Sequence, residues 1–155
     1  MQSVELTTGR RIGVVLHPGD DVLSTIADAC VFHGVKQGYV SVFLGAFRSV
    51  RFIASHEPVA DPEPPLKDST TVEYVEGVGS GSVTWDEVLG APQVHLHVAV
   101  GVKDDAAAGH AGHLLAATTH YVAELVIEEV LAPTMSRVSD VNAHGLENLA
   151  FTYRG

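Results

Sequence analysis

The sequence predicts an α+β fold, in which a mostly antiparallel sheet of about seven or eight strands accompanies one main helix. One segment carries apolar residues at helical spacing between an acidic start and a glycine stop. Short segments rich in β-branched and aromatic residues make up most of the remainder. The chain has 155 residues, close to the usual length of one domain, so residues 1–155 are expected to form a single domain.

The first element is strand-like. Residues 1–16 have the composition of strands around a turn at Thr8-Gly9. Beyond that turn, Ile12, Val14 and Leu16 are apolar on one parity, which is typical of a strand with one buried face. We therefore expect a strand that ends near residue 16.

The helix follows a turn at residues 17–21 and is expected over about 21–33. Asp20 or Asp21 can accept hydrogen bonds from the free backbone N–H groups of its first turn. Gly34 is a suitable stop just beyond the last turn. The apolar positions at helical spacing are Val22, Leu23, Ile26, Ala27, Cys30 and Val31.

The middle of the chain is expected to hold strand structure followed by a loop. Residues 38–47 and 49–55 have strand composition, and Gly45 within the first predicts a bulge, a bend or a close approach to the backbone. An exposed, extended loop is predicted over residues 57–67, because prolines there exclude regular structure. These prolines are Pro58, Pro62, Pro64 and Pro65.

Three further short strands are expected at residues 71–75, 82–88 and 93–100. A cluster of Gly77, Gly79 and Gly81 separates the first two. No convincing helix follows this cluster, so the sequence does not favour a phosphate-binding loop there.

The C-terminal third is expected to contain a turn at residues 103–109 and then a strand over residues 113–130. The alanine and glutamate content of the latter segment favours a helix, but the alternation of Tyr121, Ala123, Leu125 and Ile127 favours a strand. Two short strands, at residues 136–141 and 150–153, flank a turn or helical piece near residues 142–148.

Composition argues against several function classes. Nine basic and nineteen acidic residues give a net charge of −10, and the basic residues are scattered. Because DNA binding depends on basic residues that neutralise phosphates, direct DNA binding is disfavoured. The single cysteine, Cys30, is expected to be a small buried hydrophobe. No segment resembles a signal peptide or a membrane span, and we expect a cytoplasmic protein with no membrane partner.

The histidines are the most informative residues. His95 and His97 lie two positions apart in the apolar strand QVHLHVAV, so both imidazoles project from one face of it. Neutral imidazole is a preferred ligand of Zn²⁺ and neighbouring first-row ions. The pattern predicts a divalent metal site, with histidines that merely form hydrogen bonds as the alternative.

A third ligand is expected from the segment after the next turn, where His110 and His113 both qualify. Three histidines that leave one coordination position open are typical of a catalytic zinc site. No catalytic residue is assigned, because nothing in the sequence places Glu124, Glu128 or Glu147 near the histidines.

Arg48 and Gly45 are the candidate substrate-binding residues. Arg48 follows Gly45 by three positions and is a candidate for holding an anionic substrate or a carboxylate. The alternative is an arginine that is solvated or paired for structural reasons.

The motifs in combination resemble the PPC (plant and prokaryote conserved) domain. They are LHPGDDVLSTIADACVFHGVKQGYVSVFLGAFRSVRF, VEYVEGVGSGSV, VHLHVAV and GHLL, within residues 11–130. The resemblance implies an α+β fold, a homotrimer whose subunits contact edge to edge, and a metal site on His95, His97 and His113. It also implies a fold similar to that of acetolactate decarboxylase, a three-histidine zinc enzyme, although fold alone does not establish function.

Two departures from the family bear on function. The Arg-Gly-Arg-Pro core of the AT-hook, which makes much of the DNA contact in plant members, is absent, and the loop before Gly112 carries the extra His110. We therefore expect a trimer that binds a divalent metal, with Zn²⁺ as the expected ion, and acts on a small anionic molecule. The alternative is a non-enzymatic DNA-associated or protein-interaction regulatory module.

Overall fold

The computed structural model describes residues 2–61, 63 and 66–153. In this part of the chain, seven strands and one α-helix confirm the predicted α+β class. The elements are β1 (Thr7–Leu16), α1 (Val22–His33), β2 (Gly38–Ile53), β3 (Ser69–Asp86), β4 (Ala91–Val102), β5 (Ala108–Ala132), β6 (Thr134–Ser139), a 3-10 turn (Val141–Ala143) and β7 (Glu147–Thr152). Among the described residues, no helix is long and apolar enough to cross a membrane.

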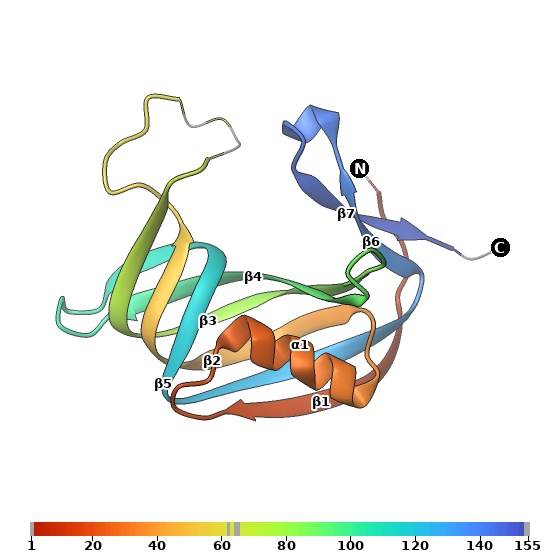
Figure 1. The fold of residues 1–155 in the computed structure, drawn as a ribbon, viewed down its shortest axis with the longest axis horizontal. Coiled ribbons are helices and arrows are strands. Elements are labelled where there is room, and N and C mark those ends of the chain that lie inside the picture. The colour runs from red at the N-terminus through yellow and green to blue at the C-terminus, as the bar shows by residue number, and fades with distance from the viewer. Residues whose placement is uncertain (1, 62, 64–65, 154–155) are drawn as a thin grey trace.

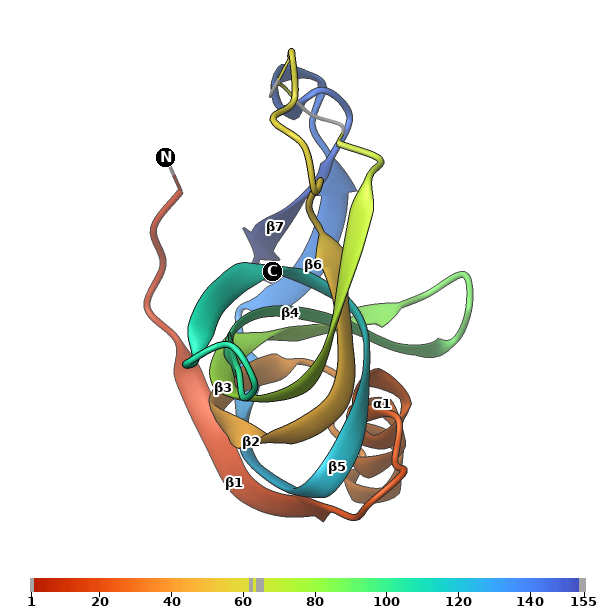
Figure 2. The same cartoon turned by 90° about the vertical axis from the view of Figure 1, so that its left-hand side faces the viewer.

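Five strands form one antiparallel sheet in the order β1-β5-β2-β3-β4, and an additional pairing of β4 with β5 closes it into a barrel. Closure is possible because β5 is 25 residues long. Its first part pairs with β4 and its remainder with β2 and β1. Figure 2 looks nearly along this barrel, and Figure 1 shows the β6–β7 hairpin rising from one end of it.

Helix α1 lies against the outside of the strands in Figure 1. Asp21, and not Asp20, caps its first turn by accepting a 2.9 Å hydrogen bond from the backbone N–H of Ser24. Gly34 ends the helix with φ of 68°, in the left-handed region that glycine adopts without strain. Cys30 is fully buried, and burial raises the pKa of its thiol to about 11. The predictions for this helix and this cysteine are confirmed.

The prediction of two strands on either side of the glycine cluster is wrong, because β3 runs without a break from Ser69 to Asp86. Gly77, Gly79 and Gly81 all face β4, where a side chain has no room. A Cβ on Gly79 would meet the carbonyl oxygen of His97 at 2.6 Å. The glycines therefore allow close approach of the two strands, and the core side chains of β4 fill the space that they leave.

Other differences concern the limits of elements. The predicted turn at Thr8-Gly9 is absent, since both residues belong to β1, which has register irregularities there. The strand structure predicted for residues 38–47 and continued at 49–55 is confirmed as a single strand, β2. Strand β5 begins at Ala108, inside the predicted turn, but its strand character is confirmed. In the predicted proline loop, Pro62, Pro64 and Pro65 lie outside the described residues.

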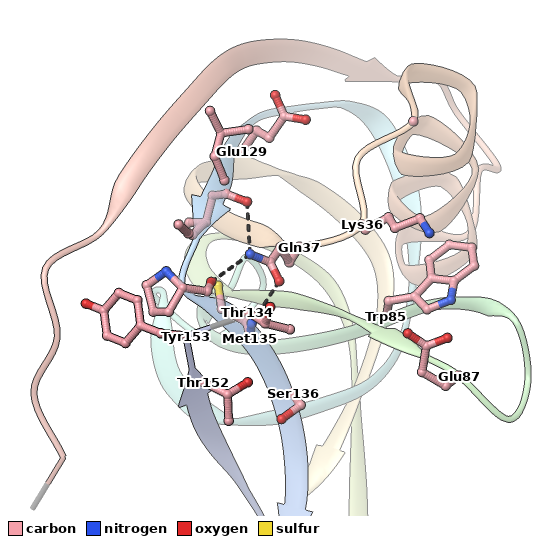
Figure 3. Close-up of a pocket in the computed structure, with 15 residues that line it drawn as sticks. Lys36, Gln37, Trp85, Glu87, Glu129, Thr134, Met135, Ser136, Thr152 and Tyr153 are labelled. Carbon is pink, nitrogen blue, oxygen red and sulfur yellow. Dashed lines mark hydrogen bonds between the residues drawn. The ribbon is translucent and has the colours of Figure 1, made fainter. Parts of the chain in front are cut away.

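Gln37 fixes the junction from which the hairpin leaves the barrel. Its amide nitrogen donates to the carbonyl oxygens of Val130 and Pro133, at 3.0 and 2.9 Å, and its amide oxygen accepts from the N–H of Met135 at 2.8 Å. Figure 3 shows these bonds among the residues that line an open hollow. The hollow has a volume of about 600 Å³. The bonds hold the start of β6 in one direction relative to β5, and β6 in turn contacts β3.

Candidate metal centre

Three histidines meet on the outer face of the barrel. One possible ligand nitrogen from each of His95, His97 and His113 lies within 4.8 Å of the others. The ring centroids are 4.6 Å apart for His95 and His113, 5.3 Å for His95 and His97, and 5.4 Å for His97 and His113. The structure therefore brings together the three residues that the sequence proposed as ligands.

Strand geometry accounts for the first two. His95 and His97 lie on one face of β4, while Leu96 between them is buried in the core. The same-face arrangement predicted from the His-x-His spacing is thus confirmed. Leu96 and Val98 pack inside the barrel. Turning the imidazoles of β4 inward would therefore expose these two apolar side chains to solvent.

The pairing of β4 with β5 supplies the third histidine. His113 is the direct partner of His97 in the antiparallel ladder, so both side chains lie on the same face. His110 is three positions earlier in β5 and therefore on the opposite face. It is the partner of Val100, and its ring centroid lies 6.2 Å from that of Phe52. Of the two histidines left open by the sequence, only His113 joins the group.

The surroundings of His95 and His113 favour their neutral form. Burial lowers the pKa of His95 to about 4, with further lowering from the charge of Arg137 and from the other two histidines. Burial also lowers the pKa of His113, and His97 and Arg137 add to the effect. A neutral imidazole offers the lone pair that a metal ion needs. The donor set thus fits a borderline ion such as Zn²⁺, which would be held by His95, His97 and His113.

Arg137 is the residue at this site that sequence reasoning missed. It lies on β6 and donates a hydrogen bond from Nη2 to the hydroxyl of Ser82. Ser82 is the ladder partner of His95 on one side and of Tyr39 on the other. The available signal was a lone arginine in the predicted strand 136–141, but nothing local indicated which surface that strand would cover.

Glu147 also lies in this neighbourhood. Its carboxylate accepts a 3.1 Å hydrogen bond from the side chain of Gln93, which is two residues before His95 on the same face of β4. Burial lowers the pKa of Arg137. The charge of Glu147, and to a lesser extent Tyr39, raises this pKa and partly offsets the effect of burial. The hairpin thus brings near the histidines one of the three glutamates that the sequence left unplaced.

The two candidate substrate-binding residues lie elsewhere on the sheet. Gly45 faces Ala123, whose Cβ would be 2.6 Å from an added Cβ, so the predicted close approach is confirmed. It lines an open hollow of about 530 Å³ with Val78, Tyr121 and others, and none of the three histidines belongs to that lining. Arg48 is exposed on β2. Substrate binding by Arg48 and Gly45 stays a prediction.

Residues 3–131 match the model of the Plants and Prokaryotes Conserved (PCC) domain family. No curated protein matches the chain. Among solved structures, a Ralstonia eutropha JMP134 protein, named as a candidate DNA-binding protein, has 23% identity and a TM-score of 0.72, covering 89% of each chain.

Two archaeal structures are similar over nearly the whole chain. A metal-containing protein of Archaeoglobus fulgidus has 21% identity and a TM-score of 0.73, covering 100% of both chains. A plant- and prokaryote-conserved protein of Pyrococcus horikoshii has 20% identity and a TM-score of 0.74, covering 96% of this chain and 97% of that chain. At these identities the likeness shows the fold.

The likeness to acetolactate decarboxylase is distant. A Staphylococcus aureus protein similar to that enzyme has 14% identity and a TM-score of 0.46, covering 79% of this chain and 53% of that chain. We draw no functional argument from it.

Proposed function

The chain belongs to the Plants and Prokaryotes Conserved domain family, and on that premise we propose that it binds Zn²⁺ through His95, His97 and His113 and acts on a small anionic molecule. The observation that supports this most directly is the convergence of three ligand nitrogens within 4.8 Å. In a tetrahedral site with Zn–N bonds of 2.0–2.1 Å, ligand nitrogens are about 3.3 Å apart. Metal binding would therefore draw the three ligand nitrogens closer together than the 4.8 Å within which they lie.

The charge of the site supports an anionic ligand. Three neutral imidazoles leave the charge of a divalent ion uncompensated, and Arg137 adds a second positive charge beside His95 and His113. When bound, a metal of this kind polarises a carbonyl or carboxylate group, or lowers the pKa of a water molecule. The residues that would hold the metal lie on two paired strands, β4 and β5, and Arg137 would supply a positive charge beside them.

Metal analysis of protein purified without a metal-affinity tag tests the proposal. We expect about one zinc per chain in the wild type and its loss in His95→Ala. His110→Ala is the matched control, because it removes a histidine from the same segment but from the opposite face of β5. Substoichiometric metal that is the same in the wild type and His95→Ala would overturn the proposal.

We further propose that the protein is a homotrimer, as the family resemblance implies. The hollow beside Gly45 supports association, because its apolar side chains are exposed on three neighbouring strands. These residues are Leu44, Val78, Tyr121 and Val122. Light scattering is expected to give three times the chain mass, and Val78→Asp to give a smaller species. Val88→Asp is the control, because Val88 is also an exposed valine but lies in a turn outside this hollow.

The second candidate is a non-enzymatic module associated with DNA or with another protein. It is favoured by the name of the Ralstonia structure and opposed by the net charge of −10. Binding to duplex DNA at near-physiological ionic strength, weakening as salt increases, would favour this function. If no binding to duplex DNA is detected even at low salt, direct DNA binding is excluded as the function of this protein.

A further inference from the structure

We propose that Arg137 binds the anionic end of the molecule that the three histidines serve, and that this molecule is a short carboxylate with a second oxygen donor directed at the metal. The inference rests on the metal site proposed above and names its substrate class. Oxalate and 2-oxo or 2-hydroxy acids have this chemistry. The structure supports the assignment through the position of Arg137, its unused hydrogen-bond donors and the burial of its surroundings.

One row of side chains across the sheet shows where Arg137 lies relative to the histidines. Tyr39, Ser82 and His95 are consecutive ladder partners on β2, β3 and β4, and partners of this kind have Cβ atoms about 4.5–5.5 Å apart. The guanidinium of Arg137 is bonded to the middle member of the row. It is therefore adjacent to His95, and the next row of the same face holds His97 and His113.

The donors of Arg137 are largely unused. A guanidinium has five N–H donors, and among the described residues Arg137 uses them for one hydrogen bond, which Nη2 donates to the hydroxyl of Ser82. Arg10 and Arg11 show the contrasting case, since each forms an ion pair with a glutamate of β5. In the described part of the chain Arg137 forms no such pair, although it is half-buried.

A half-buried cation without a counter-ion is costly unless an anion arrives. The charge of Glu147 raises the pKa of Arg137, but the Glu147 carboxylate accepts a hydrogen bond from Gln93 and forms no ion pair with Arg137. A planar guanidinium is suited to hold a carboxylate through two parallel hydrogen bonds. The second oxygen donor of the molecule, outside that carboxylate, is then left to face the histidines.

The site has a buried wall on the side of β3. Ser82 is 6% exposed and Thr84, two residues further on the same face, is 1% exposed. The hydroxyl of Thr84 has no hydrogen-bond partner among the described residues. The hairpin therefore covers this part of the sheet and leaves polar groups available beneath it. Arg48 offers no comparable setting, because it is exposed on β2.

The test uses the full-length protein loaded with Co²⁺, whose visible absorption reports on its ligands. The loaded protein is titrated with oxalate, which offers a carboxylate to Arg137 as well as a metal ligand, and with azide, which offers a metal ligand but no carboxylate. In Arg137→Met we expect the dissociation constant for oxalate to rise about 10–100-fold and that for azide by less than about 5-fold. Arg137→Lys keeps the charge but not the planar fork, and is expected to recover part of the oxalate affinity.

Two further variants separate the explanations. Arg51→Met removes an exposed arginine of the same strand as Arg48 and is the matched control, with no change expected. Arg48→Met tests whether oxalate is held instead by Arg48, the substrate-binding residue predicted from the sequence. Co²⁺ binding with equal oxalate affinity in the wild type and Arg137→Met overturns the role of Arg137 and leaves the metal site standing. Failure of the wild type to bind Co²⁺ overturns the metal site, and with it this inference.

Discussion

His97 on β4 and His113 on β5 are direct ladder partners, with ring centroids 5.4 Å apart. The pairing places His113, sixteen positions after His97 in the chain, beside both His97 and His95. Because β4 and β5 are joined by a short turn and pair from Val102–Ala108 onward, the register cannot slip by one residue without moving His113 to the opposite face. The ligand set thus depends on the register of one hairpin.

We expect His97→Ala and His113→Ala to remove the thermal stabilisation by Zn²⁺ equally. A ligand at 100 times its dissociation constant adds about 2.7 kcal/mol to the free energy of unfolding, or roughly 5–10 °C in Tm for a chain of this size. Melting curves with Zn²⁺ and with a chelator measure the shift. A full shift retained in either variant would contradict a three-histidine site.

Gly81→Ala is expected to lower the free energy of unfolding by about 1–3 kcal/mol or more, because an added Cβ would collide with the carbonyl oxygen of His95. Separation of β3 from β4 should also weaken metal binding. Gly13→Ala in β1 is the matched control, since its added Cβ would meet no atom within 4 Å. Urea denaturation compares the two, and similar losses would show that close approach of β3 and β4 is not what requires glycine.

The metal-free protein is expected to lose stability as the pH falls from about 6.5 to about 4. The folded pKa of His95 is lowered to about 4 by burial, Arg137, His113 and His97, whereas the unfolded chain protonates this group near 6.5. In that window the unfolded state binds a proton that the folded state does not, so unfolding becomes easier. His95→Gln should reduce the slope of urea midpoint against pH, and an unchanged slope would count against this cause.

Glu129→Gln is expected to lower Tm at pH 7. The Glu129 carboxylate accepts from Arg10 Nε at 2.9 Å and from Nη2 at 2.8 Å, which holds its pKa below the ordinary value. A lowered carboxyl pKa stabilises the folded state above the unfolded pKa, and this stabilisation is lost as the pH falls through the folded pKa. The difference in Tm from the wild type should therefore vanish in acid.

Glu73→Gln, at an exposed position of β3, is the control for that comparison. It is expected to leave Tm within about 1–2 °C of the wild type at both pH values. A Glu129→Gln variant that behaves like this control would show that the pair with Arg10 does not stabilise the fold.

The sequence alone determined the features that depend on neighbouring residues. The helix followed from its apolar spacing, its acidic cap and Gly34. The common face of His95 and His97 followed from the twofold alternation of side chains along a strand. Both are properties of a few consecutive residues, so no knowledge of the rest of the fold was needed to predict them.

The tertiary structure decided the features that depend on which strands meet. The choice of His113 over His110 required the register of β5 against β4, and the arrival of Arg137 required the path of a hairpin beyond the barrel. The continuity of β3 through Gly79 likewise depends on how closely β4 approaches. Cross-strand pairing joins residues that are far apart in the chain, and periodicity within one segment carries no information about its partner.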